Sequence, residues 1–100
     1  MKKIMAHRGA RNLWAENSLT GFRNVQKLDV DSVEFDLHLT NAGQILVIHD
    51  STLERTTDAQ GHVRELDDET RRTIHLKDEQ GVVTDDHIPT FEEVLDVLAA

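Results

Sequence analysis

The chain has 100 residues, enough for one domain with a modest core. Its 19 acidic and 11 basic side chains give a formal net charge of −8, which argues against a non-specific nucleic-acid binder because phosphate binding needs a basic surface. The lack of cysteine excludes disulfides, thiolate metal ligands and a cysteine nucleophile. The apolar stretch before His7 is too short for a signal peptide and no other run is long enough to span a membrane, so we predict a cytoplasmic protein.

A short buried strand is predicted over residues 3–6, and it ends at the triplet His7-Arg8-Gly9. The carboxyl ends of strands are where α/β folds place their chemistry. A histidine can pass a proton, an arginine can hold a phosphate through two hydrogen bonds, and a glycine lets a ligand approach the backbone. By itself the triplet is a weak signal, because a polar loop at the end of a strand often contains these residue types.

A helix is predicted to begin at Asn17, which can act as its N-cap. One face of this helix is apolar and carries Leu19, Phe22, Val25 and Leu28. A strand over residues 32–40, a turn at residues 41–43 and a second strand over residues 44–48 follow, because the composition is rich in β-branched residues around a glycine-containing turn.

The first strand of this hairpin carries two carboxylates, Glu34 and Asp36, which share one face because strand side chains alternate. The simple interpretation is a solvated polar face. The alternative is a cation site, since two adjacent carboxylates repel each other and hard ions such as Mg²⁺ and Ca²⁺ prefer oxygen ligands.

The turn geometry favours a site at this face of the hairpin. A tight turn near Ala42 places residues whose numbers sum to 83 or 84 opposite one another. His49 or Asp50 then lies opposite Glu34, and Val47 or Ile48 lies opposite Asp36. We therefore expect His49 beside the acidic pair, whereas His38 lies nearer the turn and is expected to be a partly exposed strand residue.

Residues 51–87 are polar and irregular, and they predict a surface excursion rather than core, with a short helix candidate over residues 67–76. The histidines of this part, His62, His75 and His87, are expected to be surface residues.

A helix start follows at Thr90, whose spacing to Glu93 is that of a capping box. Its apolar stripe consists of Phe91, Val94, Leu95 and Leu98. The order of strands and helices predicts an α/β fold with open sheet edges.

Taken together, several motifs resemble the glycerophosphodiester phosphodiesterase family in composition and order. They are His7-Arg8-Gly9-Ala10, Glu16-Asn17-Ser18, Val33-Glu34-Phe35-Asp36-Leu37 with Leu39-Thr40 and Gly43, Val47-Ile48-His49-Asp50, Thr52-Leu53-Glu54-Arg55-Thr56-Thr57, and Ile88-Pro89-Thr90-Phe91-Glu92-Glu93-Val94-Leu95. The resemblance covers nearly the whole chain. It differs from the family pattern at Ala15, where proline is usual, and at Ala42, where aspartate is common.

This resemblance implies the N-terminal part of a TIM (β/α)₈ barrel, with residues 1–100 as a partial phosphodiesterase domain and residues 51–87 as an inserted surface segment. It further implies hydrolysis of glycerophosphodiesters to glycerol 3-phosphate and an alcohol, in glycerol and lipid metabolism. By position, Glu34 and Asp36 would bind a divalent metal, Mg²⁺ or Ca²⁺. His7 and His49 would be the general acid and base, and Arg8 would hold the phosphate of the small-molecule substrate. Glu16 belongs near the same pocket.

A complete barrel needs about 250 residues, so the resemblance covers only its first part and ends before the strand that carries the family's third metal carboxylate. A non-catalytic cation- or phosphate-binding fragment, or one that self-associates through its open sheet edges, is therefore an alternative. A phosphoinositide-cleaving phospholipase C is a second enzymatic alternative. The retention of all five site residues favours descent from a working phosphodiesterase.

Overall fold

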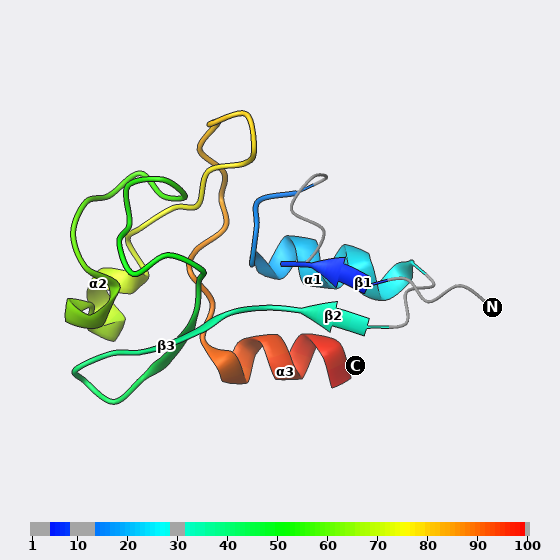
Figure 1. Cartoon of the computed structure of the whole chain (residues 1–100), viewed down its shortest axis with the longest axis horizontal. Coiled ribbons are helices and arrows are strands. Elements are labelled where there is room, and N and C mark those ends of the chain that lie inside the picture. The colour runs from blue at the N-terminus through cyan, green and yellow to red at the C-terminus, as the bar shows by residue number, and fades with distance from the viewer. Residues whose placement is uncertain (1–4, 9–13, 29–31, 100) are drawn as a thin grey trace.

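The computed structural model describes residues 5–8, 14–28 and 32–99, with side chains from residue 8 onward (Figure 1). The elements follow the expected order of strands and helices. In chain order they are β1 (Met5–His7), α1 (Leu19–Lys27), β2 (Ser32–Glu34), β3 (Leu37–Leu39), β4 (Ile45–Val47), the 3₁₀ helix η1 (Val63–Glu65), α2 (Asp68–Arg71) and α3 (Phe91–Ala99). The molecule is elongated, measuring 43 × 29 × 19 Å. No helix among these residues has the length and apolar character needed to span a membrane.

Strands β1 and β2 are parallel and are joined through helix α1, which makes a βαβ unit. Their register pairs Ala6 with Val33 and His7 with Glu34. The two strands therefore end side by side, so the residues that follow them, Arg8 and Asp36, emerge at the same edge of the sheet. This register brings together two motifs that lie far apart in the sequence.

Helix α1 begins one residue later than predicted. Its N-cap is Ser18, whose Oγ accepts a hydrogen bond from the backbone N–H of Gly21 at 2.9 Å. The prediction of Asn17 as N-cap is wrong, because Asn17 has the left-handed φ of 54° and its side chain turns away toward Asp36. A serine with extended backbone angles is an equally good N-cap, which leaves Asn17 available for another role.

Helix α3 begins with the predicted capping box. The backbone N–H of Glu93 donates to Thr90 Oγ1 at 3.2 Å, and the N–H of Thr90 donates to Glu93 Oε1 at 2.9 Å. Helices α1 and α3 lie next to each other along the β1–β2 pair (Figure 1). Between them Phe35 contacts Phe22 edge-on at a centroid distance of 5.7 Å and Phe91 at 6.0 Å. This aromatic cluster fixes the chain immediately before Asp36.

The predicted strand over residues 32–40 is two strands, because the chain changes pairing partner at Phe35 and Asp36. The hairpin of β3 and β4 has the register with residue numbers summing to 84, such as His38 opposite Leu46. The N–H of Ile48 donates to the Asp36 carbonyl at 3.0 Å, so Ile48 faces Asp36 as predicted. The predicted pairing of His49 or Asp50 with Glu34 is wrong, since Glu34 pairs with His7 of β1.

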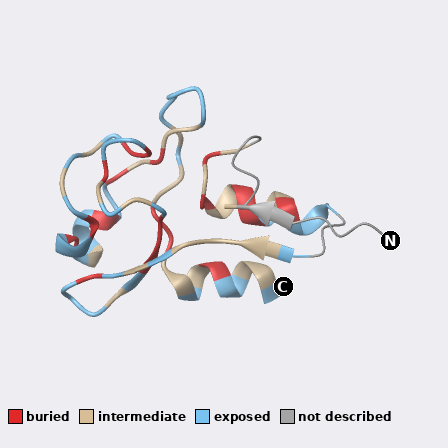
Figure 2. Ribbon diagram, viewed as in Figure 1, coloured by how far each residue is buried: buried red, intermediate tan, exposed pale blue. Residues whose placement is uncertain are grey.

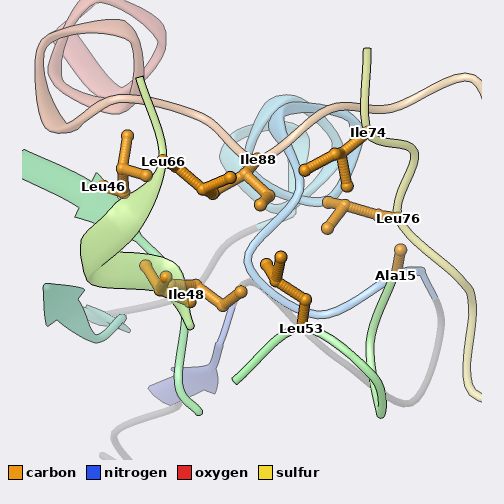
Figure 3. Close-up of a cluster of buried hydrophobic side chains, with 9 residues drawn as sticks. Ala15, Leu46, Ile48, Leu53, Leu66, Ile74, Leu76 and Ile88 are labelled. Atoms are coloured by element: carbon orange, nitrogen blue, oxygen red, sulfur yellow. The ribbon is translucent and has the colours of Figure 1, made fainter. Parts of the chain in front are cut away.

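The segment of residues 51–87 contributes to a buried core that it shares with other parts of the chain, so the expectation of a surface excursion rather than core is wrong. Its buried apolar side chains converge with residues before and after the segment (Figures 2 and 3). The cluster consists of Ala15, Leu46, Ile48, Leu53, Val63, Leu66, Ile74, Leu76 and Ile88. Irregular spacing hid this core from periodicity analysis, because most of the segment is held by turns and isolated bridges. The helix candidate over residues 67–76 is reduced to the single turn of α2.

Candidate active site

The carboxyl ends of β1 and β2 bring Arg8 and Asp36 together. Arg8 Nε lies 3.5 Å from Asp36 Oδ2, and Arg8 Nη1 lies 3.5 Å from Glu16 Oε2. The Arg8 side chain is only 12% exposed and has a left-handed φ of 51°. A non-glycine residue in this conformation is uncommon and typical of functional loops. The arrangement places a guanidinium between two carboxylates, those of Glu16 and Asp36, at one edge of the sheet.

Asn17 holds the loop that contains Arg8. Its backbone N–H donates to the Arg8 carbonyl at 2.8 Å, and its Nδ2 donates to Asp36 Oδ2 at 3.3 Å. Asn17 Oδ1 is buried and has no hydrogen-bond partner among the residues that the structure describes. Sequence analysis assigned Asn17 only a capping role and missed these contacts. The available signal was the serine that follows it, since Ser18 can cap the helix and asparagine tolerates the left-handed region.

The His49 ring is oriented by its neighbour Asp50. His49 Nδ1 lies 2.7 Å from Asp50 Oδ1, and a neutral ring can make this hydrogen bond only with its proton on Nδ1. Nε2 of the neutral ring then carries the lone pair that can accept a proton. His38 Nε2 lies 2.9 Å from the His49 carbonyl oxygen and donates to it. His38 therefore fixes the His49 backbone, a function that the sequence did not predict.

Arg55 connects Asp50 with Glu16. Its Nε and Nη2 donate to Asp50 Oδ2 and Oδ1 at 2.8 and 3.0 Å, and its Nη1 and Nη2 donate to Glu16 Oε1 and Oε2 at 2.9 Å each. Arg55 and then His49 hold the pKa of the Asp50 carboxyl well below its usual range. Asp50, followed by Glu16, raises the pKa of the Arg55 guanidinium. The His49 ring is thus linked to Arg8 through alternating charges.

The predicted metal ligands lie at the same edge. Glu34 ends β2, and Asp36 follows two residues later. The Asp36 carboxylate lies beside Asn17, whose buried Oδ1 has no hydrogen-bond partner among the described residues, and carboxylate and amide oxygens are ligand types that hard divalent cations take. Within residues 5–8, 14–28 and 32–99, no three His, Cys, Asp or Glu side chains gather closely enough to hold a metal ion. Glu34, Asp36 and Asn17 therefore suit a hard cation in ligand type, whereas the described residues supply no complete cluster of metal ligands. The His7 side chain lies outside the described part.

The segment of residues 51–87 borders the site. A pocket of about 170 Å³ is lined both by the charged pair Glu16 and Arg55 and by a loop of residues 77–81. Its remaining lining residues are Thr56, Lys77, Asp78, Glu79 and Gly81. The histidines of the insertion do not reach this place. The His75 and His87 rings instead contact each other, with centroids 4.7 Å apart and planes tilted by 43°. His87 Nδ1 also donates to the Ile74 carbonyl at 2.9 Å, so the expectation that both are simple surface residues is wrong, because both are partly buried and have partners.

Parallel strands joined by a helix, with basic and acidic groups at their carboxyl ends, correspond to the first part of a TIM barrel. Residues 7–100 match the Glycerophosphoryl diester phosphodiesterase family model, and the chain belongs to this family. The glycerophosphodiester phosphodiesterase of Bacillus altitudinis is 37% identical over 98% of this chain and 40% of its own length.

Solved structures give the same result for the fold. A glycerophosphoryl diester phosphodiesterase from Parabacteroides distasonis superimposes with a TM-score of 0.89 at 36% identity, covering 97% of this chain and 34% of that one. A phosphodiesterase from Oleispira antarctica, solved with the product sn-glycerol-3-phosphate, has a TM-score of 0.86 at 24% identity, covering 99% of this chain and 40% of that one. The chain thus spans about two fifths of the length of several curated relatives that it matches.

Proposed function

We propose that this chain carries part of the active site of a hydrolase that cleaves glycerophosphodiesters to glycerol 3-phosphate and an alcohol. The observation that carries the proposal is the placement of Arg8 between Glu16 and Asp36 at the carboxyl ends of β1 and β2. A phosphodiester is an anion, and its hydrolysis needs a positive group at the phosphate. A cytoplasmic location and a place in glycerol and lipid metabolism belong to the same proposal.

In this proposal each of the five predicted residues has one role. Arg8 binds the phosphate oxygens, and Glu34 and Asp36 hold a divalent cation, Mg²⁺ or Ca²⁺. When bound, the cation neutralises negative charge on the phosphate. His7 and His49 transfer protons as general acid and base. The Nδ1–Asp50 hydrogen bond supports this role for His49, because it leaves Nε2 to exchange a proton with an oxygen of the substrate.

The proposed reaction begins with attack by the glycerol 2-hydroxyl on phosphorus. The bond from phosphorus to the alcohol oxygen breaks, one imidazole takes the hydroxyl proton and the other protonates the leaving oxygen. Water then opens the cyclic phosphate to give glycerol 3-phosphate. Trapping of the cyclic species supports this route. Solvent ¹⁸O in the product without any cyclic species contradicts it and favours direct attack by water.

Isothermal titration of Mg²⁺ and Ca²⁺ into the chain tests the cation site. We expect binding by the wild type and loss of binding in the Glu34→Gln/Asp36→Asn double variant. The matched control is Asp85→Asn/Glu92→Gln, which removes the same two charges from exposed positions outside the site and should bind like the wild type. Equal binding by all three proteins would overturn the assignment of Glu34 and Asp36.

Release of glycerol 3-phosphate from glycerophosphocholine tests the reaction. Turnover that disappears in the His49→Gln and Arg8→Gln variants supports the proposal. Turnover that is unchanged in both variants contradicts it. Cation binding without turnover would favour the non-catalytic alternative, in which this part of the fold binds a cation or phosphate only.

Self-association is a second candidate property, which the exposed apolar side chains of the hairpin favour. Leu37, Leu39 and Ile45 of β3 and β4 are 46%, 67% and 41% exposed. Exposed apolar strand residues are typical of interaction surfaces. Sedimentation velocity should reveal concentration-dependent assembly, and Leu39→Lys should reduce it. A monomer at all concentrations would exclude this property.

A further inference from the structure

A single guanidinium joins the two charged groups of the site. Arg55 is bound on one edge by Asp50, which orients the His49 ring, and on another edge by Glu16, which contacts Arg8. We infer that Arg55 is a positioning residue that fixes the His49 ring and the Arg8 side chain relative to each other. The inference deepens the proposed function and rests on it for the roles of His49 and Arg8.

The geometry requires an arginine. Its four hydrogen bonds measure 2.8 to 3.0 Å and use Nε, Nη1 and Nη2, with Nη2 shared between the two carboxylates. Only a planar guanidinium presents two edges with paired donors, whereas a lysine ammonium acts as a point charge on a flexible stem. Both oxygens of Asp50 and both oxygens of Glu16 are therefore held in place by one group.

The consequence for His49 concerns its tautomer. A carboxylate next to a histidine in the sequence can rotate and leave the ring without a fixed partner. Arg55 prevents this rotation, because it holds Asp50 Oδ2 at 2.8 Å while Asp50 Oδ1 accepts from His49 Nδ1 at 2.7 Å. The proton of the neutral ring is thereby kept on Nδ1, and Nε2 remains the nitrogen that exchanges protons.

The inserted segment supplies and supports Arg55. The turn around it is anchored by Thr57, whose N–H and Oγ1 both donate to the Leu53 carbonyl, at 3.0 and 2.7 Å. The Lys77 N–H donates to the Thr56 carbonyl at 2.7 Å. Leu53, Thr56 and Thr57 are all buried. The core of the insertion therefore holds a rigid turn that presents Arg55 to the site, which gives the insertion a role in positioning.

Nitrogen-15 spectra of the imidazole groups of the full chain test this inference without any turnover. In Arg55→Gln, the ratio of the Nδ1–H to the Nε2–H tautomer of neutral His49 should fall by roughly fivefold, the ratio that one modest hydrogen bond controls. Arg55→Lys should restore only part of the ratio. Arg72→Gln is the matched control, since Arg72 is exposed and pairs with Asp68 away from the site, and it should leave the ratio unchanged.

A double-variant cycle separates positioning from a general effect on folding. In an Asp50→Asn background, Arg55→Gln should cause no further change in the His49 tautomer, because Arg55 acts through Asp50. Where turnover is measurable, Arg55→Gln should lower kcat roughly ten- to a hundredfold. An unchanged His49 tautomer in both Arg55 variants would overturn the inference. The wild-type chain could also lack phosphodiesterase activity while Arg55→Gln loses the tautomer preference of His49. That result would support positioning by Arg55 and contradict the proposed function.

Discussion

The Arg71 guanidinium donates to the carbonyl oxygen of Ile88 at 2.8 Å and so connects α2 with the residues that lead into α3. The same side chain pairs with Asp68 at 2.7 Å and with Glu93 at 3.2 Å, and it is only 5% exposed. Glu93 in turn closes the capping box with Thr90. One buried cation therefore fixes the insertion against the start of the second helix that packs on the sheet.

Replacement of Arg71 by leucine should lower the free energy of unfolding by about 2 kcal/mol, because the Ile88 carbonyl and two carboxylates lose a charged donor. Asp68 and Glu93 are nearly half exposed, so water compensates part of the loss. Urea unfolding followed by circular dichroism measures the change. Arg72→Leu is the control. Because Arg72 is 71% exposed and its ion pair with Asp68 is open to solvent, the loss should stay below about 0.5 kcal/mol. Equal losses in the two variants would contradict this account of Arg71.

The stability of the chain should fall as pH decreases below about 4, in part because of Asp50. Arg55, and to a smaller extent His49, lower the pKa of Asp50 in the folded chain, whereas an unfolded aspartate has a pKa of about 3.9. As the pH falls, Asp50 is therefore protonated in the unfolded chain before it is protonated in the folded chain. The contribution of Asp50 to stability is complete above the unfolded pKa and is lost as the pH falls toward the lower pKa of the folded chain.

Urea unfolding of Asp50→Asn between pH 7 and pH 3 measures this contribution. The wild type should be the more stable protein at pH 7, and the difference should shrink as the pH falls. Arg55→Gln should show the same convergence, since it removes the main cause of the lowered pKa. A difference that stays constant across this range would exclude the proposed linkage.

Asn17 should tolerate glycine better than alanine. Both substitutions remove the contact of Asn17 with Asp36, but only alanine is strained at the φ of 54°. Asn17→Ala should therefore be less stable than Asn17→Gly by about 1 kcal/mol in thermal or urea unfolding. Arg23, an exposed residue within α1, is the control. At this helical position the glycine variant should be less stable than the alanine variant by a similar amount, which is the reverse of the order expected at Asn17. If the glycine and alanine variants had the same order of stability at both positions, a backbone effect at Asn17 would be contradicted.

Thr90→Ala should destabilise the chain by about 1 kcal/mol, since the N–H of Glu93 loses its capping oxygen. Thr90→Ser keeps that oxygen and should retain most of the stability. Hydrogen exchange at the first turn of α3 locates the effect, because protection there should fall in the alanine variant only. Faster exchange in both variants would indicate that the methyl group of Thr90, rather than its hydroxyl, stabilises this helix start.

The hairpin and the start of α3 were predictable because their determinants are local. The turn residues around Gly43, which has a φ of 87°, set the register that pairs His38 with Leu46. The capping box depends on Thr90 and Glu93, which are three residues apart. The break at Phe35 and Asp36 was not predictable, because it arises where the chain leaves the pair with β1 and begins the pair with β4.

The residues proposed for the candidate site came from the resemblance, whereas their contacts came from the structure. The resemblance indicated Arg8, Glu34, Asp36 and His49, and the structure places Arg8 against Asp36. The contribution of Arg55 was not predicted, because it depends on a contact with Glu16 across 39 positions of sequence. The core of the insertion was missed for a similar reason, since residues such as Leu53 and Ile74 show no periodic spacing.

The sequence by itself determined the order of most strands and helices, where α3 begins, and which basic and acidic side chains are available to the candidate site. These properties follow from spacing, capping and side-chain chemistry, which act over a few residues. Only the tertiary structure decided how these groups meet: the parallel register that sets Arg8 beside Asp36, and the turn that inserts Arg55 between Glu16 and Asp50. Such contacts depend on packing between segments far apart in the chain, which no local pattern encodes.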